Sequence, residues 1–311
     1  MPYRVAGELA AGVASFVQAA ARAGDAVLIA AATANLGFLR DRLRAADGRV
    51  AWADIGSAGL NPARLTALLR QLADGAPGRL WCVHEPAWPA RSAEELREVF
   101  RHEALLNQAL AGARASILCP YDMRLGGAAI SCAEQTHPAV IRGSRREPSS
   151  SFTGSIPAQC DQPLGPPPAD AQVLEYRDDL AGVRRFAAAR ARLAGLAPER
   201  AADLVSAVSE LAANTLSHTT GPGTLSVWRT GGEVVCQAED TGQITDVLAG
   251  TARRDPAAPG GGRGLWLVHQ LCDLAQIRTG PGGTTIRVHM HLGQRRQTAP
   301  PGGARAGSRV L

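Results

Sequence analysis

The stretch from Pro198 to His218 restricts the fold of this chain more than any other, because its apolar residues follow the period of an α-helix. The apolar stripe is expected to face a core. It consists of Leu204, Val208, Leu211 and Thr215. A second, polar stripe carries Glu210, Asn214 and His218 at four-residue intervals. The sequence therefore predicts one long helix with a polar edge beside a buried face.

The polar stripe combines a carboxylate and a carboxamide one turn apart, which suits a site for a magnesium nucleotide. The amide oxygen of Asn214 can ligate a hard Mg²⁺ ion, and Glu210 can activate a nucleophile beside it. Taken alone, the pattern E-x-x-x-N is more common on a solvated helix face. The interpretation therefore depends on the motifs that follow downstream.

Length and composition indicate a soluble chain of about two domains. Of the 311 residues, 45% are hydrophobic, and no apolar run approaches the ~18 residues of a membrane span. The first residues lack the basic segment and apolar run of a secretion signal, so we expect a cytoplasmic protein without a membrane partner. The six cysteines are scattered without a C-x-x-C pair, which favours reduced, mostly buried thiols over a disulfide framework or a zinc site.

The formal net charge of +5 is concentrated at the end of the chain. Four arginines lie in residues 294–311, which contain no acidic residue and are expected to be a disordered basic tail. The remainder is close to neutral and only 4% of residues are aromatic, so we expect no direct nucleic-acid partner. All 33 basic residues are arginine, which excludes a Walker-A loop, because that loop needs a lysine on the phosphates.

Residues 1–142 alternate short apolar runs with amphipathic segments. The runs that predict buried strands are residues 26–32, 50–54, 80–84 and 115–119. Helix signals lie between them: Asn61 precedes a proline, and Ser92 with Glu95 forms a capping box. Strand and helix in alternation predict a doubly wound α/β domain with right-handed crossovers.

Ligands of such a sheet bind beyond the carboxyl ends of the strands. Five residues are expected there as a sensory ligand site: Asp54, His84, Glu85, Tyr121 and Asp122. Loop capping and packing at the rim explain the same residues equally well. Both interpretations stay open at this point.

Four segments of the first domain form a recognisable set: GLNPARL, HEPAWPARSAEEL, RHEALLN and ILCPYD. Together they resemble the MEDS type of sensory domain, over most of residues 7–140. Members of that family resemble a RecA-like ATPase fold that has lost its P-loop, which agrees with the missing lysine. The resemblance implies sensing or protein contact and names no ligand.

Residues 143–172 are rich in serine, proline and glycine without periodicity, which predicts a disordered linker with an exposed Cys160. A second domain is expected at residues 173–293. It opens with an arginine-rich amphipathic helix at residues 178–194, and the Glu210 helix follows. Its predicted strands are residues 224–228, 233–239, 274–278 and 284–291. Helices with antiparallel strands in this order predict an α+β sandwich.

Four motifs of the second domain follow in order: E-x-x-x-N on a helix, D-x-G after a strand, a glycine cluster before a helix, and G-T-T before a final strand. This order resembles the Bergerat-type (GHKL, HATPase_c) ATP-binding fold of gyrase, histidine kinases and MutL, over residues 175–292. Within that superfamily, the domain is similar to the anti-sigma-factor serine/threonine kinases. The resemblance implies ATP and Mg²⁺ as cofactors, with Asn214 on the metal.

The D-x-G motif supplies adenine selectivity in this interpretation. The carboxylate of Asp240 can accept a hydrogen bond from the exocyclic amine of adenine and would repel the carbonyl of guanine. Gly242 lets the backbone approach the base without a Cβ. In the family, the threonine of the G-T motif joins the aspartate in holding adenine, and by alignment that residue is Thr284.

The glycine cluster replaces the missing P-loop. Backbone N–H groups around Gly260, Gly262 and Gly264, with the N-terminus of the helix that follows, form an anion nest for phosphates. Arg263 adds a charge to this nest. Residues 247–259 have the length of an ATP lid, although a plain surface loop has the same appearance.

The resemblance implies an anti-sigma regulatory factor that controls the availability of a sigma factor. In it, Glu210 removes the proton from a serine or threonine hydroxyl of an anti-anti-sigma (STAS-type) protein, which receives the phosphate. A second hypothesis is a module that binds ATP and sequesters the sigma factor without phosphate transfer. A third, a histidine-kinase-type sensor, needs an acceptor histidine on a dimerisation hairpin. His102 matches that box superficially but falls on a crossover helix, where packing is expected. A homodimer stays open.

Overall fold

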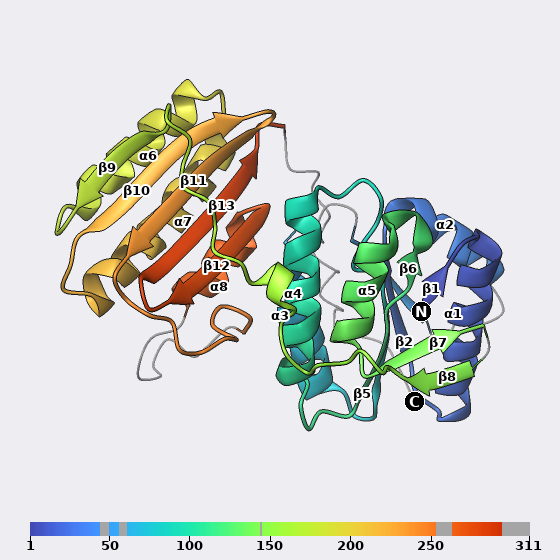
Figure 1. Cartoon of the computed structure of the whole chain (residues 1–311). Helices are drawn as coiled ribbons and strands as arrows, with labels where there is room; N and C mark the ends of the chain where they lie inside the picture. The colour runs from blue at the N-terminus through green and yellow to red at the C-terminus, as the bar shows by residue number, and fades with distance from the viewer. Residues whose placement is uncertain (44–49, 56–60, 144, 253–262, 294–311) are drawn as a thin grey trace.

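A computed structural model describes residues 1–43, 50–55, 61–143, 145–252 and 263–293 (Figure 1). Two layered domains lie side by side, and each has its own sheet and hydrophobic core. Within these stretches, no helix combines the length and the apolar character that crossing a bilayer requires.

Four parallel strands form the sheet of the first domain, in the order β3-β2-β4-β5. They are β2 (Val27–Ala31), β3 (Val50–Asp54), β4 (Leu80–His84) and β5 (Ala115–Leu118). Each coincides with a predicted apolar run to within one residue at either end. The prediction of a parallel α/β sheet is confirmed, whereas a specifically RecA-like architecture stays a prediction.

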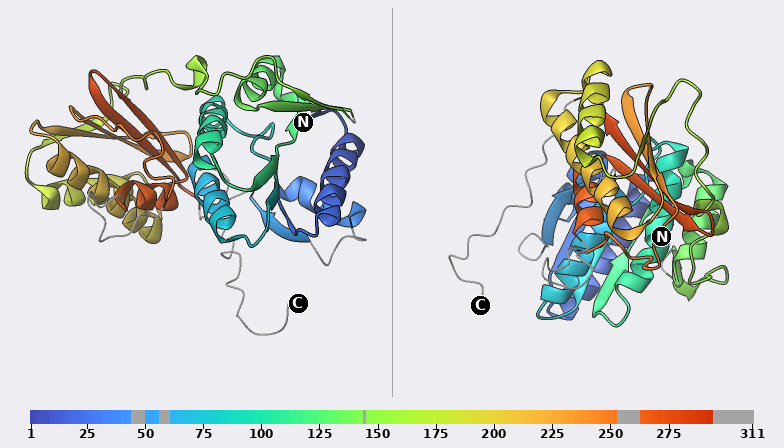
Figure 2. Two further views of the ribbon diagram at one scale, coloured as in Figure 1. Left: turned by 90° about the horizontal axis from the view of Figure 1, so that it is seen from below. Right: turned by 90° about the vertical axis from the view of Figure 1, so that its left-hand side faces the viewer.

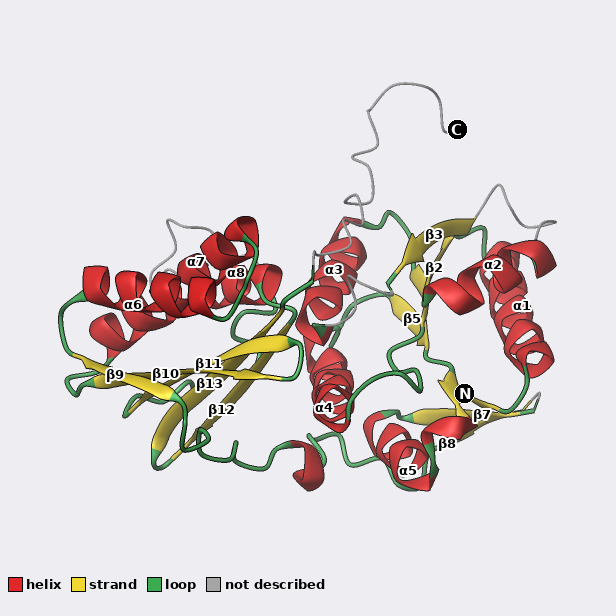
Figure 3. Cartoon of the chain, turned by 90° about the horizontal axis from the view of Figure 1, so that it is seen from above, coloured by secondary structure: helices red, strands yellow, loops and turns green. Residues whose placement is uncertain are grey.

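Helices cover both faces of this sheet (Figure 3). On one side lie α1 (Ala6–Arg22) and α2 (Thr33–Arg42), and on the other lie α3 (Pro62–Gly75) and α4 (Ala93–Ala109). The neighbouring residues Ile29 and Ala30 of β2 belong to the two opposite cores, which explains why the strands are apolar on both faces.

The two predicted helix starts of this domain are both present. The side chain of Asn61 accepts a hydrogen bond from the backbone N–H of Ala63 at the start of α3. Ser92 and Glu95 form the reciprocal capping box of α4. These caps satisfy backbone N–H groups that have no partner inside the helix.

Short elements complete the first domain. Strand β1 (Pro2–Tyr3) pairs with β6 (Tyr121–Asp122), and η3 (Met123–Leu125) leads into α5 (Gly127–Thr136). Strand β7 (Ala139–Arg142) then pairs with β8 (Arg145–Pro148). The sequence did not predict these strands, because two to four residues are too few for a periodic pattern.

The segment after β8 corrects the prediction of a disordered linker at residues 143–172. The short helix η4 (Ala158–Cys160) packs against α4, and Cys160 is only 1% exposed. The chain then crosses the face of the second sheet that carries no helices (Figure 3). There Arg278 donates to the backbone carbonyls of Cys160 and Gln162, and Arg287 donates to that of Gly165. The expectation of an exposed Cys160 is therefore wrong.

The second domain contains an antiparallel sheet in the order β12-β13-β11-β10-β9. Its strands are β9 (Gln172–Tyr176), β10 (Gly223–Thr230), β11 (Glu233–Asp240), β12 (Leu274–Gly280) and β13 (Gly283–His291). Helices α6 (Leu180–Leu193), α7 (Pro198–His218) and α8 (Gly264–Leu271) cover one face (Figure 2). The predicted α+β sandwich is confirmed, and β9 is the strand that the sequence did not reveal.

Candidate nucleotide-binding site

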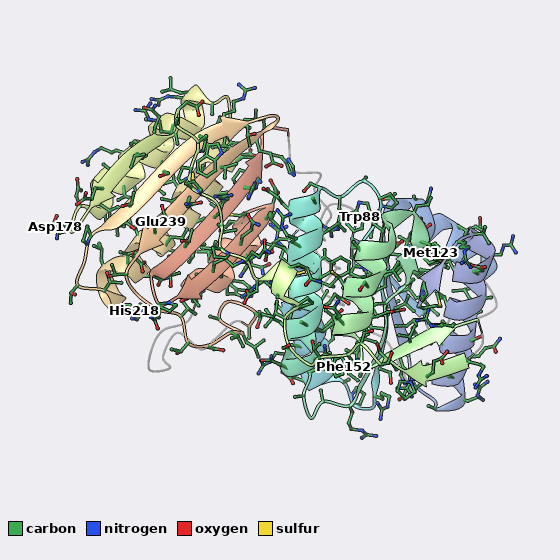
Figure 4. All side chains as sticks on the ribbon, in the orientation of Figure 1. Trp88, Met123, Phe152, Asp178, His218 and Glu239 are labelled. Atoms are coloured by element: carbon green, nitrogen blue, oxygen red, sulfur yellow. The ribbon has the colours of Figure 1, made fainter. Side chains whose placement is uncertain are left out.

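Helix α7 has the bounds that the sequence predicts. Pro198 occupies its first turn, and Leu204 and Leu211 are 0% and 2% exposed in the core of the domain. Glu210 and Asn214 are half-buried at the edge of this core. His218 is exposed where the helix ends (Figure 4). The helix thus places a carboxylate and a carboxamide one turn apart beside the sheet.

The N-terminus of α8 lies against this pair. A Cβ built on Gly264 would lie 2.7 Å from a carboxylate oxygen of Glu210 and 3.5 Å from the amide nitrogen of Asn214. A larger residue would therefore separate the start of α8 from the polar stripe. Of the predicted site residues, the structure brings Glu210, Asn214 and Gly264 together, at a helix end whose N–H groups attract anions.

Asp240 ends β11 with both carboxylate oxygens engaged. Oδ1 accepts a hydrogen bond from the N–H of Gly242 at 2.8 Å, and Oδ2 accepts one from the hydroxyl of Thr215 at 2.7 Å. Tyr176 donates its hydroxyl to Thr215 at 3.1 Å. Because each carboxylate oxygen can accept a second hydrogen bond, Asp240 keeps the capacity to bind a donor on a ligand.

Thr215 lines the candidate site, and the sequence did not reveal its polar role. It was placed in the apolar stripe of α7, and it is indeed only 1% exposed. Its hydroxyl, however, orients Asp240 rather than packing on the core. The sequence did contain a signal for this role: a hydroxyl residue follows the apolar residues Leu204, Val208 and Leu211 on the same face of the helix.

Glycines allow the turn after β11 to approach its neighbours. Gly283 has a φ of +118°, and a Cβ there would lie 2.0 Å from the backbone oxygen of Asp240. A Cβ on Gly242 would lie 2.7 Å from the Cγ2 of Thr219. The hydroxyl of Thr284 donates to the carbonyl of Gly242 at 2.8 Å, so Thr284 holds this turn in place. A contact of Thr284 with adenine stays a prediction.

A cavity of about 330 Å³ joins these features. Five predicted site residues line it: Asn214, Asp240, Gly242, Gly264 and Thr284. The apolar part of the wall includes Leu211, Ile244 and Leu265. Glu210 does not line the cavity, but its carboxylate lies beside Gly264, which does line it. The wall therefore combines polar side chains with an apolar part, and nucleotide and small-molecule sites combine the two in the same way.

Some predicted residues lie outside the described part of the chain. These are Gly260, Gly262 and residues 253–259 of the predicted lid. Arg263 is described, and it is exposed immediately before α8. Of the predicted lid, residues 247–250 form a turn and residues 251–252 form a bend.

The three carboxylates predicted for the sensory site have partners within the protein. Each accepts hydrogen bonds from a neighbouring segment: Asp54 from Thr33, Glu85 from Asn35 and Ala32, and Asp122 from Arg124. Burial raises the pKa of Glu85, and the hydrogen bond from Arg124 lowers the pKa of Asp122. The other two residues, His84 and Tyr121, both approach Glu103 of α4. A sensory role for the five stays a prediction.

His102 lies within α4 and is 5% exposed. Its ring meets that of His269 edge-on, with the ring centroids 6.0 Å apart. The expected packing role is confirmed, and this burial removes the residue from contact with a phosphate donor.

The first domain contacts α8 directly, at the end away from the cavity. Asn61 and Arg64 donate to the backbone carbonyl of His269, and Arg64 also donates to that of Cys272. Cations at a helix C-terminus stabilise it. In addition, Arg278 of β12 forms a buried ion pair with Glu98 of α4. The helix whose N-terminus lines the cavity is therefore fixed at its C-terminus by the first domain.

Comparisons with protein families agree with both resemblances. Residues 175–290 match the family of histidine kinase-like ATPase domains, and residues 1–138 match the MEDS family, the methanogen/methylotroph, DcmR sensory domain. The chain thus carries a match to the MEDS family followed by a match to the histidine kinase-like ATPase domains.

Among solved structures, one similar to the chain is the crystal structure of the RsbU and RsbW domains of Rv1364c from Mycobacterium tuberculosis. The two share 22% sequence identity with a TM-score of 0.29. The match covers 39% of this chain and 32% of that one, so this chain spans about a third of its length. No curated protein matches the chain.

Proposed function

We propose that residues 173–293 bind ATP with Mg²⁺ and transfer the γ-phosphate to a serine or threonine of an anti-anti-sigma (STAS-type) protein. The chain would thereby control the availability of a sigma factor in response to a signal at the MEDS domain. One observation carries this proposal: Glu210 and Asn214 lie together at Gly264, and Asn214 and Gly264 line the cavity that Asp240 also lines.

The residues of this cavity fit a magnesium nucleotide. Asp240 can accept a hydrogen bond from the amine of adenine, and the N–H groups at the start of α8 can bind phosphate. Gly264 keeps that space free, because a Cβ there would reach Glu210. The amide oxygen of Asn214 is a suitable Mg²⁺ ligand. ATP supplies the phosphoryl group, and Mg²⁺ offsets the charge that develops on it.

In this proposal Glu210 acts as general base. The hydroxyl oxygen of the partner's serine or threonine forms a bond to the γ-phosphorus as the bond between that phosphorus and ADP breaks, and the hydroxyl proton passes to the Glu210 carboxylate. Asn214, one turn further along α7, would position the metal beside the same point. A module that only binds ATP and sequesters the sigma factor would need Asn214 but not this carboxylate.

A transfer assay with radiolabelled ATP tests the proposal, with the full chain and a STAS-type partner recovered by pull-down. Glu210→Gln preserves the shape of the side chain, so nucleotide and partner binding should persist. Phosphate transfer should fall by about 10²- to 10⁴-fold, the typical contribution of a positioned base. Glu199→Gln is the matched control, because Glu199 is exposed in the first turn of the same helix.

The outcomes separate the hypotheses. Full transfer by Glu210→Gln would show that Glu210 is not the base. Absence of transfer by the parent, with ATP binding retained, would favour the sequestering module.

A further inference from the structure

Three side chains with metal-binding donor atoms meet inside the first domain. His84 ends β4, Cys119 follows β5, and Glu103 belongs to α4. One donor atom from each lies within 4.8 Å of the other two, and all three residues are buried. His84 and Cys119 lie at the carboxyl ends of two adjacent parallel strands, where α/β proteins bind ligands.

His84 is the member of this cluster that needs a partner. Its Nδ1 is buried without a hydrogen-bond partner, in a residue only 5% exposed. The same atom lies 3.4 Å from Oε1 of Glu103. Two ligands that bind a tetrahedral ion at ~2.0–2.1 Å are themselves roughly 3.4 Å apart. The spacing therefore matches an edge of a metal coordination shell better than a hydrogen bond.

Glu103 is oriented by contacts on its other oxygen. Oε2 lies 3.1 Å from the hydroxyl of Tyr121, which donates to it, and 3.1 Å from Nε2 of His137. These two contacts on Oε2 leave Oε1 directed at His84, as outer contacts do for metal-ligating carboxylates.

Cys119 supplies the third donor. Its Sγ is buried within 4.8 Å of the donor atoms of His84 and Glu103. The buried Nδ1 of His84 has no hydrogen-bond partner, so this nitrogen is free to bind a metal. The cluster thus offers nitrogen, oxygen and sulfur donors, a combination suited to borderline ions such as zinc.

We propose that His84, Glu103 and Cys119 bind one divalent ion of the zinc class, with a fourth coordination position open to a ligand. Three protein ligands with one open position are typical of zinc sites that act on small molecules. A cavity of about 700 Å³ reaches the cluster, and Glu103, Cys119 and His137 line it. The proposal is independent of phosphate transfer in the second domain.

With the ion bound, the site would carry no net charge. Binding forms one bond each to nitrogen, oxygen and sulfur, and the thiol proton of Cys119 leaves to solvent without any change of oxidation state. The thiolate and the carboxylate then offset the two positive charges of the ion. This avoids an uncompensated charge in the core, which would be costly.

The test uses the untagged full chain, freed of metal by a chelator and titrated with Co²⁺ as a spectroscopic probe. We expect one equivalent to bind, with a thiolate-to-cobalt charge-transfer band and the strong visible bands of a four-coordinate ion. Cys119→Ala should lose the charge-transfer band. Cys132→Ala should retain it, because Cys132 is another buried cysteine of the same domain but lies on α5 outside the cluster.

A measurement without variants guards against misfolding. X-ray absorption of the zinc-loaded parent should show one sulfur at ~2.3 Å and the remaining ligands at ~2.0–2.1 Å. Absence of stoichiometric binding, absence of a sulfur ligand, or an unchanged cobalt spectrum in Cys119→Ala would each overturn the proposal.

Discussion

Replacement of Thr215 by valine tests how the orientation of Asp240 contributes to nucleotide binding. Valine has nearly the shape of threonine, so the packing of α7 is preserved while the hydroxyl is lost. That hydroxyl donates to Oδ2 of Asp240 at 2.7 Å and accepts from Tyr176 at 3.1 Å. The substitution therefore removes one hydrogen bond to a carboxylate and leaves a second hydroxyl without its acceptor.

The size of the effect follows from these two bonds. A hydrogen bond to a charged group contributes about 1.5–3 kcal/mol, and a bond between neutral groups about 0.5–1.5 kcal/mol. If Asp240 must be held in this orientation to bind adenine, the loss of the first bond lowers ATP affinity by roughly 10- to 100-fold. We expect the free energy of unfolding to fall as well, by about 2 kcal/mol.

Titration calorimetry of the full chain with Mg-ATP, with urea unfolding in parallel, measures both quantities. Thr215→Ser is the matched control, because it keeps the hydroxyl and loses only a methyl group. We expect the serine variant to bind ATP much more tightly than the valine variant. Equal affinities, in two folded variants, would refute the reasoning that Thr215 positions Asp240 for the nucleotide.

Three further predictions concern single residues. Asn214→Ala should abolish magnesium-dependent ATP binding in calorimetry with an unchanged circular dichroism spectrum, and binding at the parental affinity would contradict its metal role. Gly283→Ala should destabilise the chain by more than about 1 kcal/mol in urea, because φ is +118° and the new Cβ would meet the backbone of Asp240. Arg278→Ala should cost about 3–5 kcal/mol at neutral pH, because it leaves Glu98 buried without its cation. Burial raises the pKa of Glu98, so this carboxyl destabilises the fold as pH rises from its ordinary pKa to the raised one. The variant should therefore lose less stability at pH 5 than at pH 8. An equal loss of stability at both pH values would contradict the assignment.

The sequence predicted the elements that local pattern determines. Local signals include the helical period of α7, the glycines at 242 and 264, and the acid of the D-x-G motif. In the structure, the two glycines lie at close approaches and the acid accepts a hydrogen bond. The apolar runs of the first domain likewise identified its four parallel strands.

The remainder depends on contacts between distant segments. The chain around Cys160 is fixed by Arg278 and Arg287, which donate to its backbone carbonyls. Every sequence has such carbonyls, so composition suggested disorder instead. Similarly, Arg64 and Asn61 contact the end of α8 from more than two hundred positions away in the sequence. The cluster of His84, Glu103 and Cys119 comes from three separate elements and has no spacing signature.

Helix α4 belongs to the first domain and also contacts the second. Leu106 packs in the core of the first domain, whereas Glu98 and His102 face Arg278 and His269 of the second. Unfolding of either domain would expose a buried charge or a core face of the other. The thermal unfolding transitions of the two domains should therefore merge into one cooperative transition. A nucleotide bound to the second domain would then also raise the temperature at which the tryptophans of the first domain become exposed.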